Sequence, residues 1–137
     1  MRPARFLIEC SPLVVLGLLA AGGCQASYSQ AGATRTVAAY EFGSLKADLP
    51  QTCRVPAVVA AGEAALRHRG YAITASSATD ESGTVEAKSP AARNLGNAEV
   101  WAEVIPDGTR VGVKVGLLGD EDASRAILDD VLRRLGL

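Results

Sequence analysis

The strongest constraint on the fold is an alternation with a two-residue period near the C-terminus. In the segment 109–117 (TRVGVKVGL), valine or leucine alternates with polar residues and glycine. This period places the apolar side chains on one face of a strand and the others on the opposite face. The segment 99–105 is also typical of a strand, and the intervening 106–108 (Pro-Asp-Gly) favours a turn. The sequence therefore predicts an antiparallel hairpin with one buried and one wet face.

Two other segments have helical spacing. In 52–69 the apolar residues recur three and four positions apart, with Pro56 suited to a first turn and Gly70 to a C-terminal cap. A final helix is predicted after Asp120 or Asp122, either of which can cap it. Its apolar stripe consists of Ile127, Leu128, Val131, Leu132 and Leu135.

Three more segments, 37–49, 71–79 and 83–88, are predicted as strands, with an irregularity at Gly43 in the first. The predicted order is therefore strand, helix, four strands, helix. This order indicates an α+β domain, in which two helices pack on one face of an antiparallel sheet of about five strands.

The N-terminus is typical of a bacterial signal peptide spanning residues 1–23. Arg2 and Arg5 give it a positive start, and 13–21 (LVVLGLLAA) form a short apolar region that ends in small residues. Nine apolar residues are too few for a stable membrane-spanning helix, which needs about 20. We therefore expect a leader that is removed on export.

The residues 20–24 (Ala-Ala-Gly-Gly-Cys) resemble a bacterial lipobox, except that Ala21 stands where Leu or Val is preferred. The resemblance implies that Cys24 is the first residue of the mature chain and carries lipid. Gln25 follows it, and by the sorting rule of enteric lipoproteins this favours the outer membrane over the inner. The alternative is an ordinary secretory leader in which Cys24 is incidental.

After Cys24 the sequence predicts a tether and then one domain. Residues 25–36 (QASYSQAGATRT) are small, polar and aperiodic, so we expect a flexible segment over 24–36. The single α+β domain is then predicted over 37–137. A domain of this size buries enough surface to fold without a metal or a disulfide.

The chain resembles a family of small bacterial envelope lipoproteins of unknown function. The similar features are the lipobox, Tyr40, Gly43 and Leu45 of the first predicted strand, and the ending 113–128 (VKVGLLGDEDASRAIL). The resemblance implies an envelope location and the strand order given above. It implies no reaction, and so no catalytic residue.

Three features of the sequence are candidates for a catalytic or metal site. His68, the only histidine, is a candidate general base, but its place between two arginines at a helix end favours a solvated cation. Cys53, beside Arg54, is interpreted as an unpaired or intermolecular thiol rather than a nucleophile, because no base is positioned near it. The acidic turn 116–122 lacks the ligand spacing of a Ca²⁺ loop, so helix capping explains it better.

The candidate binding face is formed by Trp101, Gly112 and Gly116. Glycine inside a strand often marks a close approach by another backbone or a ligand, and Trp101 is expected in the neighbouring strand. The alternative, which the sequence leaves open, is that Trp101 only covers the glycines.

These observations favour a non-enzymatic envelope lipoprotein that contacts the membrane through Cys24 and binds an envelope protein, with no cofactor. A carrier of a small apolar ligand between sheet and helices is the alternative, and an enzyme using Cys53 comes last. Nucleic acid is not expected, because 14 basic and 15 acidic residues give a formal net charge of -1 without a basic cluster.

Overall fold

The computed structural model describes residues 26–90 and 95–137, so the predicted leader and Cys24 lie outside the described residues. The described part has an α+β fold with two helices and an antiparallel sheet, as predicted. The sheet has seven strands rather than about five. The elements are β1 (Ser27–Ala31), β2 (Thr36–Glu41), β3 (Ser44–Pro50), α1 (Val55–His68), β4 (Ala72–Ala78), β5 (Ser82–Lys88), β6 (Ala98–Ile105), β7 (Gly108–Val115) and α2 (Glu121–Arg134).

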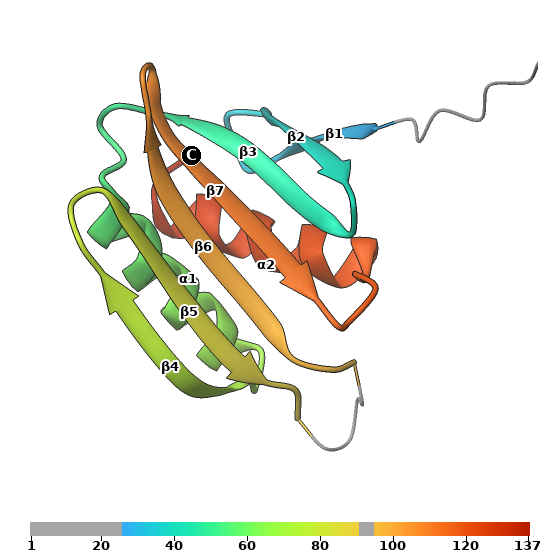
Figure 1. The fold of residues 1–137 in the computed structure, drawn as a ribbon. Helices are drawn as coiled ribbons and strands as arrows, with labels where there is room; N and C mark the ends of the chain where they lie inside the picture. The colour runs from blue at the N-terminus through green and yellow to red at the C-terminus, as the bar shows by residue number, and fades with distance from the viewer. Residues whose placement is uncertain (1–25, 91–94) are drawn as a thin grey trace, which may run out of the picture.

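The strands lie in the order β1-β2-β3-β7-β6-β5-β4, and every neighbouring pair is antiparallel (Figure 1). The predicted hairpin becomes β6–β7 at the centre of the sheet, where Val100 is paired with Val113. The chain leaves β3 through α1 and returns by way of β4, β5 and β6, so that β7 pairs with β3 on its other side. The last strand in the sequence, β7, is therefore the central strand of the sheet.

One of the two additional strands comes from the segment 37–49, which was predicted as a single strand. It is a hairpin, in which β2 and β3 are joined by Phe42 and Gly43. Both turn residues have positive φ, 50° and 76°. A two-residue turn with two positive φ values is the tight type that matches the twist of a hairpin. What looked like an irregularity at Gly43 is thus a chain reversal.

The other additional strand is β1, which lies inside the segment predicted as a tether over 24–36. Its five residues pair with β2, from Ser27 opposite Tyr40 to Ala31 opposite Thr36. Apart from Ala31, which packs against the core, the strand is held by this backbone ladder and by polar contacts to α2. One such contact is the Gly32 amide, which donates to the Asp129 carboxylate at 2.9 Å. The sheet therefore begins at Ser27, ten residues before the predicted start of the domain at Val37.

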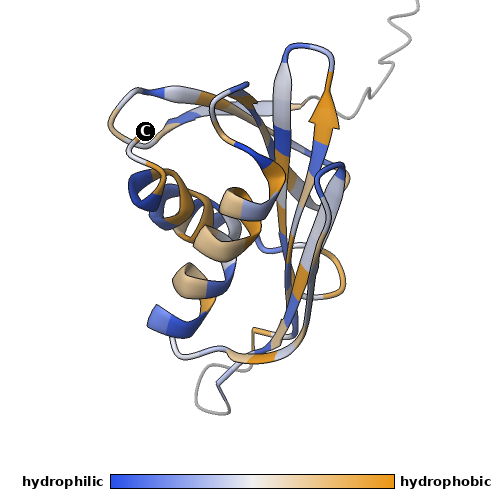
Figure 2. Cartoon of the chain, turned by 90° about the vertical axis from the view of Figure 1, so that its left-hand side faces the viewer, coloured by the Kyte–Doolittle hydropathy of each residue, from blue (hydrophilic) through white to orange (hydrophobic). Residues whose placement is uncertain are grey.

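The core lies between the helices and one face of the sheet, and Figure 2 shows both helices on the same side of the sheet. Helix α1 packs so closely on β6 that a Cβ on Gly62 would lie 2.8 Å from the Val100 side chain. The apolar stripe predicted for α2 is buried over four of its five positions, Ile127, Leu128, Val131 and Leu132. The covered face of the sheet contributes Leu45, Ala47, Leu49, Val85, Ala87, Ala98, Val100, Ala102, Val111, Val113 and Val115.

The helix ends follow the predicted signals. Pro56 lies in the first turn of α1, and Gly70 takes a φ of 84° just after its end. Asp120 caps α2, with its side chain accepting from the Ala123 amide at 2.9 Å. Over 26–90 and 95–137, no helix is long and apolar enough to cross a membrane.

Candidate functional site

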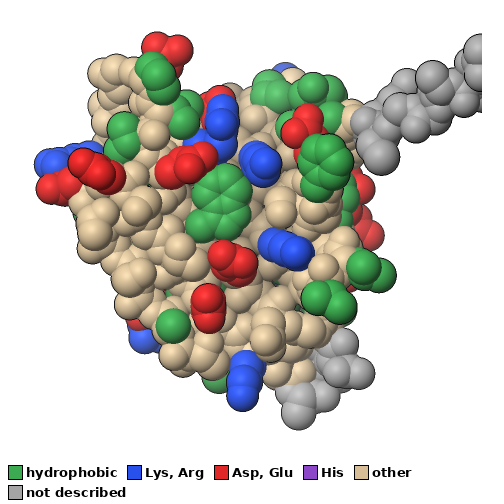
Figure 3. All heavy atoms as spheres, in the orientation of Figure 1, with side chains coloured by type: hydrophobic (Ala, Val, Ile, Leu, Met, Phe, Trp, Pro, Cys, Tyr) green, Lys and Arg blue, Asp and Glu red, His purple; other side chains and the backbone are tan. Residues whose placement is uncertain are grey.

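The face of the sheet that points away from the helices, which we call the open face, carries the predicted binding residues. It faces the viewer in Figure 3, where a large hydrophobic side chain near the centre is surrounded by acidic and basic side chains. Register places Trp101 of β6 in its central row, between Gly112 of β7 and Thr84 of β5. The row continues through Lys46 and Ala39 to Tyr28 at the edge.

Trp101 lies directly on Gly112. A Cβ built on this glycine would overlap the indole ring, at its Cε2, Cζ2 and Nε1 atoms. Gly112 is therefore buried beneath the ring, and the glycine is required for the ring to lie flat on the sheet. The structure thus confirms the predicted pairing, and it shows Trp101 covering Gly112. The indole is half-buried, so only the surface of the ring that faces away from Gly112 is exposed for contact with a partner.

Charged side chains flank the indole on both sides. Lys46 lies across its face, with Nζ 6.0 Å from the ring centroid, at the limit of a cation–π contact. In the next row, the Arg110 guanidinium donates two hydrogen bonds to Asp48, at 2.7 and 3.1 Å. These bonds, with the charge of Asp48, raise the pKa of Arg110 above its usual value. The open face is therefore mixed in charge, with its basic groups fixed by neighbouring acids or by the ring.

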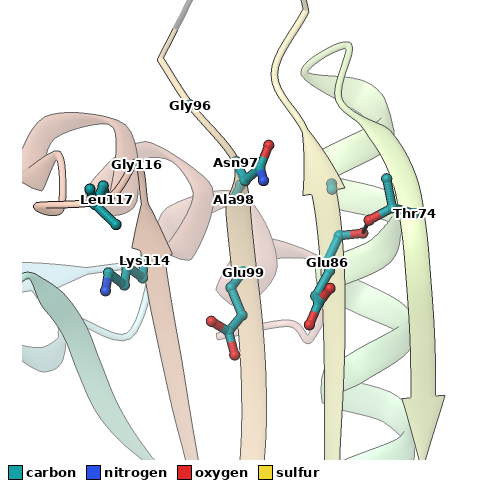
Figure 4. A pocket seen from close by; sticks show the side chains of 10 residues that line it. Thr74, Glu86, Gly96, Asn97, Ala98, Glu99, Lys114, Gly116 and Leu117 are labelled. Carbon is teal, nitrogen blue, oxygen red and sulfur yellow. Dashed lines mark hydrogen bonds between the residues drawn. The ribbon is translucent and has the colours of Figure 1, made fainter.

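A hollow of about 470 Å³ lies at one end of the open face, between β7, β6 and β5. Figure 4 shows the side chains of Glu86, Glu99, Lys114 and Leu117 around it. Glu99 is paired with Glu86 on one side and with Lys114 on the other. Two carboxylates side by side repel each other, so this hollow suits a partner group that brings positive charge or hydrogen-bond donors.

Gly116 belongs to this hollow, but it is not in the strand where it was predicted. β7 ends at Val115, and Gly116 has a φ of 75°, which turns the chain. Its amide donates to the Asn97 carbonyl at 2.8 Å. A Cβ on Gly96 would lie 2.9 Å from the Gly116 Cα. The alternation that predicted Gly116 on a strand face therefore stops at Val115. Beyond it, the close approach of the Gly96 and Gly116 backbones takes the place of the β6–β7 strand pairing.

A second hollow, also of about 470 Å³, lies on the other half of the open face. Tyr28, Val37, Glu41, Lys46, Asp48 and Arg110 contribute to its walls. Tyr28 and Val37 are unusually exposed for apolar residues, at 71% and 58%. By register, the row of Trp101 lies between the row of Glu99 and Lys114, which line the first hollow, and that of Arg110, which lines the second.

The candidate catalytic residues are not brought together. Cys53 is a buried free thiol just before the start of α1, and its amide is bonded to the Pro50 carbonyl. His68 is the last residue of α1, about 20 Å further along the axis of a 14-residue helix. Its side chain is 69% exposed, and its Nδ1 lies 3.2 Å from an Asp130 carboxylate oxygen.

The acidic turn before α2 serves the helix and the edge strand. Asp120 is the helix cap, and Glu121 binds the Ser27 hydroxyl, which donates at 2.5 Å, as well as Arg125. These contacts lower the pKa of Glu121, with the Ser27 hydrogen bond as the larger cause. Among the residues described, no group of three His, Cys, Asp or Glu side chains is placed to hold a metal ion.

Several residues of the open face were not singled out from the sequence. Lys46 and Asp48 alternate with buried residues along β3, so the signal was present. The alternation was overlooked because 37–49 was interpreted as one strand. That interpretation does not distinguish β3, which lies beside the central strand β7, from β2. Arg110 was assigned to the wet face of β7, but its pairing with Asp48 depends on β3 lying beside β7, a strand order that the local pattern does not carry.

Comparison with known proteins identifies a family without identifying an activity. No curated protein matches the chain. A family model does match, over residues 7–134 of the 137, and it is described as a protein of unknown function. The chain therefore belongs to the family named Protein of unknown function (DUF3568).

Proposed function

We propose that this protein is a bacterial envelope lipoprotein, anchored through lipid on Cys24, that binds an envelope protein partner with the open face of its sheet. In this proposal the domain performs no catalysis and needs no cofactor. The anchor faces the periplasm from the outer membrane rather than the inner.

The anchor is supported by the N-terminal sequence. A positive start, a short apolar region and small residues before Cys24 are the features that a lipoprotein signal requires. The family match starts at residue 7, so the apolar segment and Cys24 both lie within the part of the chain that the family shares. Two or more acyl chains on Cys24, at about 0.8 kcal/mol for each buried CH₂, are enough for stable anchoring.

The binding role depends on one observation, which is the flat seating of Trp101 over Gly112 on the open face. Burying the indole in the core would have removed more apolar surface from water, yet the ring lies on the uncovered side. Tryptophan on an exposed, mixed-charge surface is typical of the centre of a protein interface. The two hollows beside it supply shape and hydrogen-bonding groups around that centre.

The carrier hypothesis receives less support. Both of these hollows lie on the open face, whereas a carrier was expected to hold its ligand between the sheet and the helices. At one point of that layer, beside Gly62 and Val100, there is no room even for a Cβ. We therefore do not propose a carrier.

The anchor is tested by growing cells that express the protein with radiolabelled palmitate, beside a Cys24→Ala variant. We expect label in the wild-type protein and none in the variant, with the wild-type protein recovered in the outer membrane fraction. Equal labelling of the two proteins, or none in either, would end the proposal of an anchor.

The open face is tested by placing a photo-crosslinking amino acid at position 84, next to Trp101, and in a second protein at the exposed position 67 on α1. We expect a discrete adduct in intact envelopes from position 84, and its loss when Trp101 is also replaced by alanine. Position 67 is the matched control. The same adducts from both positions, or none from position 84, would contradict a role for this face.

A further inference from the structure

Three large apolar side chains are almost fully exposed at one end of the molecule. Phe42 is 89% exposed, Leu117 90% and Leu118 89%. Phe42 lies in the β2–β3 turn, and the two leucines lie in the turn between β7 and α2. We call these three residues the apolar tip. A soluble domain gains nothing in stability from side chains that its own fold leaves in water.

The two turns of the tip are in contact with each other. A Cβ on Gly43 would lie 2.6 Å from the Leu118 carbonyl oxygen, and a Cβ on Gly119 would overlap the Gly43 carbonyl oxygen. The Tyr40 hydroxyl also lies against Gly119, 2.6 Å from the position that a Cβ on Gly119 would take. Segments more than 70 residues apart therefore pack against each other through their backbones, and the three side chains project from these two contacting turns.

Phe42 is also in an unfavourable backbone conformation. Its φ of 50° lies in the left-handed region, which favours glycine or asparagine. An aromatic residue at this position of a tight hairpin turn costs stability, and no burial offsets that cost, because the side chain is exposed. A residue that helps neither the backbone nor the core is expected to act on something outside the fold.

The chain enters the fold at this same end. Ser27, the first residue of β1, is paired with Tyr40, two residues before Phe42. Its hydroxyl is bonded to Glu121, three residues after Leu118, and accepts from Arg125 at 2.9 Å. Figure 1 shows β1 beginning on the side of the sheet where the β2–β3 turn and the β7–α2 turn lie. Ser27 is thus fixed between the two turns that carry the apolar tip.

The length of chain before Ser27 then limits where the anchor is. Cys24 precedes it by three residues, which span at most about 10 Å when fully extended. If Cys24 carries lipid, the bilayer surface lies within that distance of Ser27. In that case the end of the molecule that carries the apolar tip is the end held against the membrane.

We propose that the apolar tip is a membrane-contacting site, in which Phe42, Leu117 and Leu118 enter the interfacial layer of the bilayer that holds the lipid anchor. This inference rests on the proposed anchor at Cys24. Side chains of this type enter the boundary between headgroups and acyl chains to a depth of about 5–10 Å. The contact fixes the orientation of the domain, with the anchor supplying most of the affinity.

The residues around the tip indicate what kind of lipid surface it suits. Tyr28, which is 71% exposed beside Ser27, is of the type that collects at the headgroup level. Glu41, Asp120 and Asp122 adjoin the tip, and no cluster of lysine or arginine surrounds it in the part of the chain that the structure describes. Attraction to anionic headgroups is therefore not the driving force, and a zwitterionic bilayer is sufficient.

A single tryptophan at the tip tests this directly. The full chain is produced in bacteria, purified in detergent and reconstituted into phosphatidylcholine vesicles with bromine on the acyl chains. The protein carries Phe42→Trp in a Trp101→Phe background, because Trp101 is the only tryptophan of the chain. We expect its emission to shift to the blue and to fall about two-fold relative to vesicles without bromine.

The matched control places the tryptophan at Val104 instead, in the same background. Val104 is also exposed, at 55%, but it lies at the end of β6, next to the turn at the opposite end of the sheet. We expect no quenching there. A second reporter, Leu118→Trp, replaces the first if the Phe42 variant does not fold, which circular dichroism shows.

Intact mass separates the two proposals. Acylated protein without quenching at the tip, or with equal quenching at positions 42 and 104, overturns the membrane-contacting tip and leaves the anchor standing. Protein without acyl chains overturns the anchor, and quenching on addition of brominated vesicles then decides the tip alone. Disulfide-linked dimers formed through Leu118→Cys, without quenching, would show that the tip binds a second copy and would also overturn the proposal.

Discussion

The two ends of the sheet are built by the same means and carry opposite surfaces. We call the end of the sheet that carries the apolar tip the near end and the opposite end the far end. At the far end, the β4–β5 and β6–β7 turns contain Asp80, Glu81 and Asp107, and the Val104 amide donates to the Glu81 carbonyl at 2.8 Å. At the near end, the β2–β3 and β7–α2 turns contain Phe42, Leu117 and Leu118. Both ends join neighbouring turns through backbone contacts. Since polar turns serve that purpose at the far end, the apolar side chains at the near end are not required by the fold.

The position of β1 decides which end of the molecule an anchor would hold at the membrane. Because β1 begins at the near end, any anchor on the preceding residues pulls that end toward the membrane and leaves the polar end outward. The open face, with Trp101 at its centre, then runs along the side of the molecule between the two ends. In our proposals the partner surface therefore adjoins the membrane contact, and Leu117 and Tyr28 lie where the two meet.

The largest expected effect compares a buried leucine with an exposed one. Leu128 of α2 is fully buried, so Leu128→Ala should lower the free energy of unfolding by about 2–5 kcal/mol. Leu118 is 89% exposed, and Leu118→Ala should change it by less than about 0.5 kcal/mol. Urea unfolding followed by circular dichroism measures both. A large loss for Leu118→Ala would mean that the near end does contribute to folding.

The second prediction concerns the contact that holds the near end together. Gly119→Ala places a methyl group against the Gly43 carbonyl in a backbone with a φ of 83°, and should cost about 2–4 kcal/mol. Gly136 is the matched control, with a φ of 79° and nothing within 4 Å of its Cβ position. Gly136→Ala should cost only about 1 kcal/mol, from the backbone alone. Equal losses in urea unfolding would show that the two turns are not in tight contact.

The third prediction is a gain in stability. Phe42→Asn suits the left-handed conformation of the hairpin turn and should raise the free energy of unfolding by about 0.5–1 kcal/mol. Phe42→Leu keeps the unfavourable backbone and should change it little. If asparagine lowers the stability instead, Phe42 makes a contact that favours the fold, and the argument that it acts outside the fold is lost.

The parts of the fold that were predicted are those encoded by neighbouring residues. The alternation around Val111 and Val113, the α2 stripe and the Asp120 cap are local patterns, and all three are present. The β2–β3 turn was missed because Phe-Gly does not resemble the Asn-Gly or Asp-Gly pairs that mark such turns. β1 was missed because its small polar residues are ordered by pairing with β2, which composition does not reveal.

In the candidate site, too, the features encoded by neighbouring residues were predictable and those that depend on distant parts of the chain were not. Pairing of Trp101 with Gly112 was predictable, because one short turn fixes the register of β6 on β7. The place of Lys46 beside that pair depends on β3 pairing with β7, in which Lys46 lies opposite Gly112, 66 residues further along the chain. The apolar tip was not predictable either, because nothing in the local sequence brings Phe42 next to Leu118. Leu117 was even expected to continue the buried face of a strand, but β7 ends two residues before it.

The smallest expected effect concerns pH at the near end. Because the Ser27 hydrogen bond and Arg125 lower the pKa of Glu121, the carboxylate stabilises the fold above its ordinary pKa of 4.5. This contribution is lost as the pH falls through the lowered pKa of the folded state. The melting temperature of the wild-type protein should therefore fall more on acidification from pH 6 to about pH 3 than that of Glu121→Gln. Asp80→Asn, which removes an exposed ion pair with Arg54 at the far end, is the control and should follow the wild type. If Glu121→Gln and the wild type lose stability equally, the Ser27–Glu121 hydrogen bond does not hold β1 to α2. Only the pairing of Ser27 with Tyr40 would then place the start of β1, and so the anchor, beside the apolar tip.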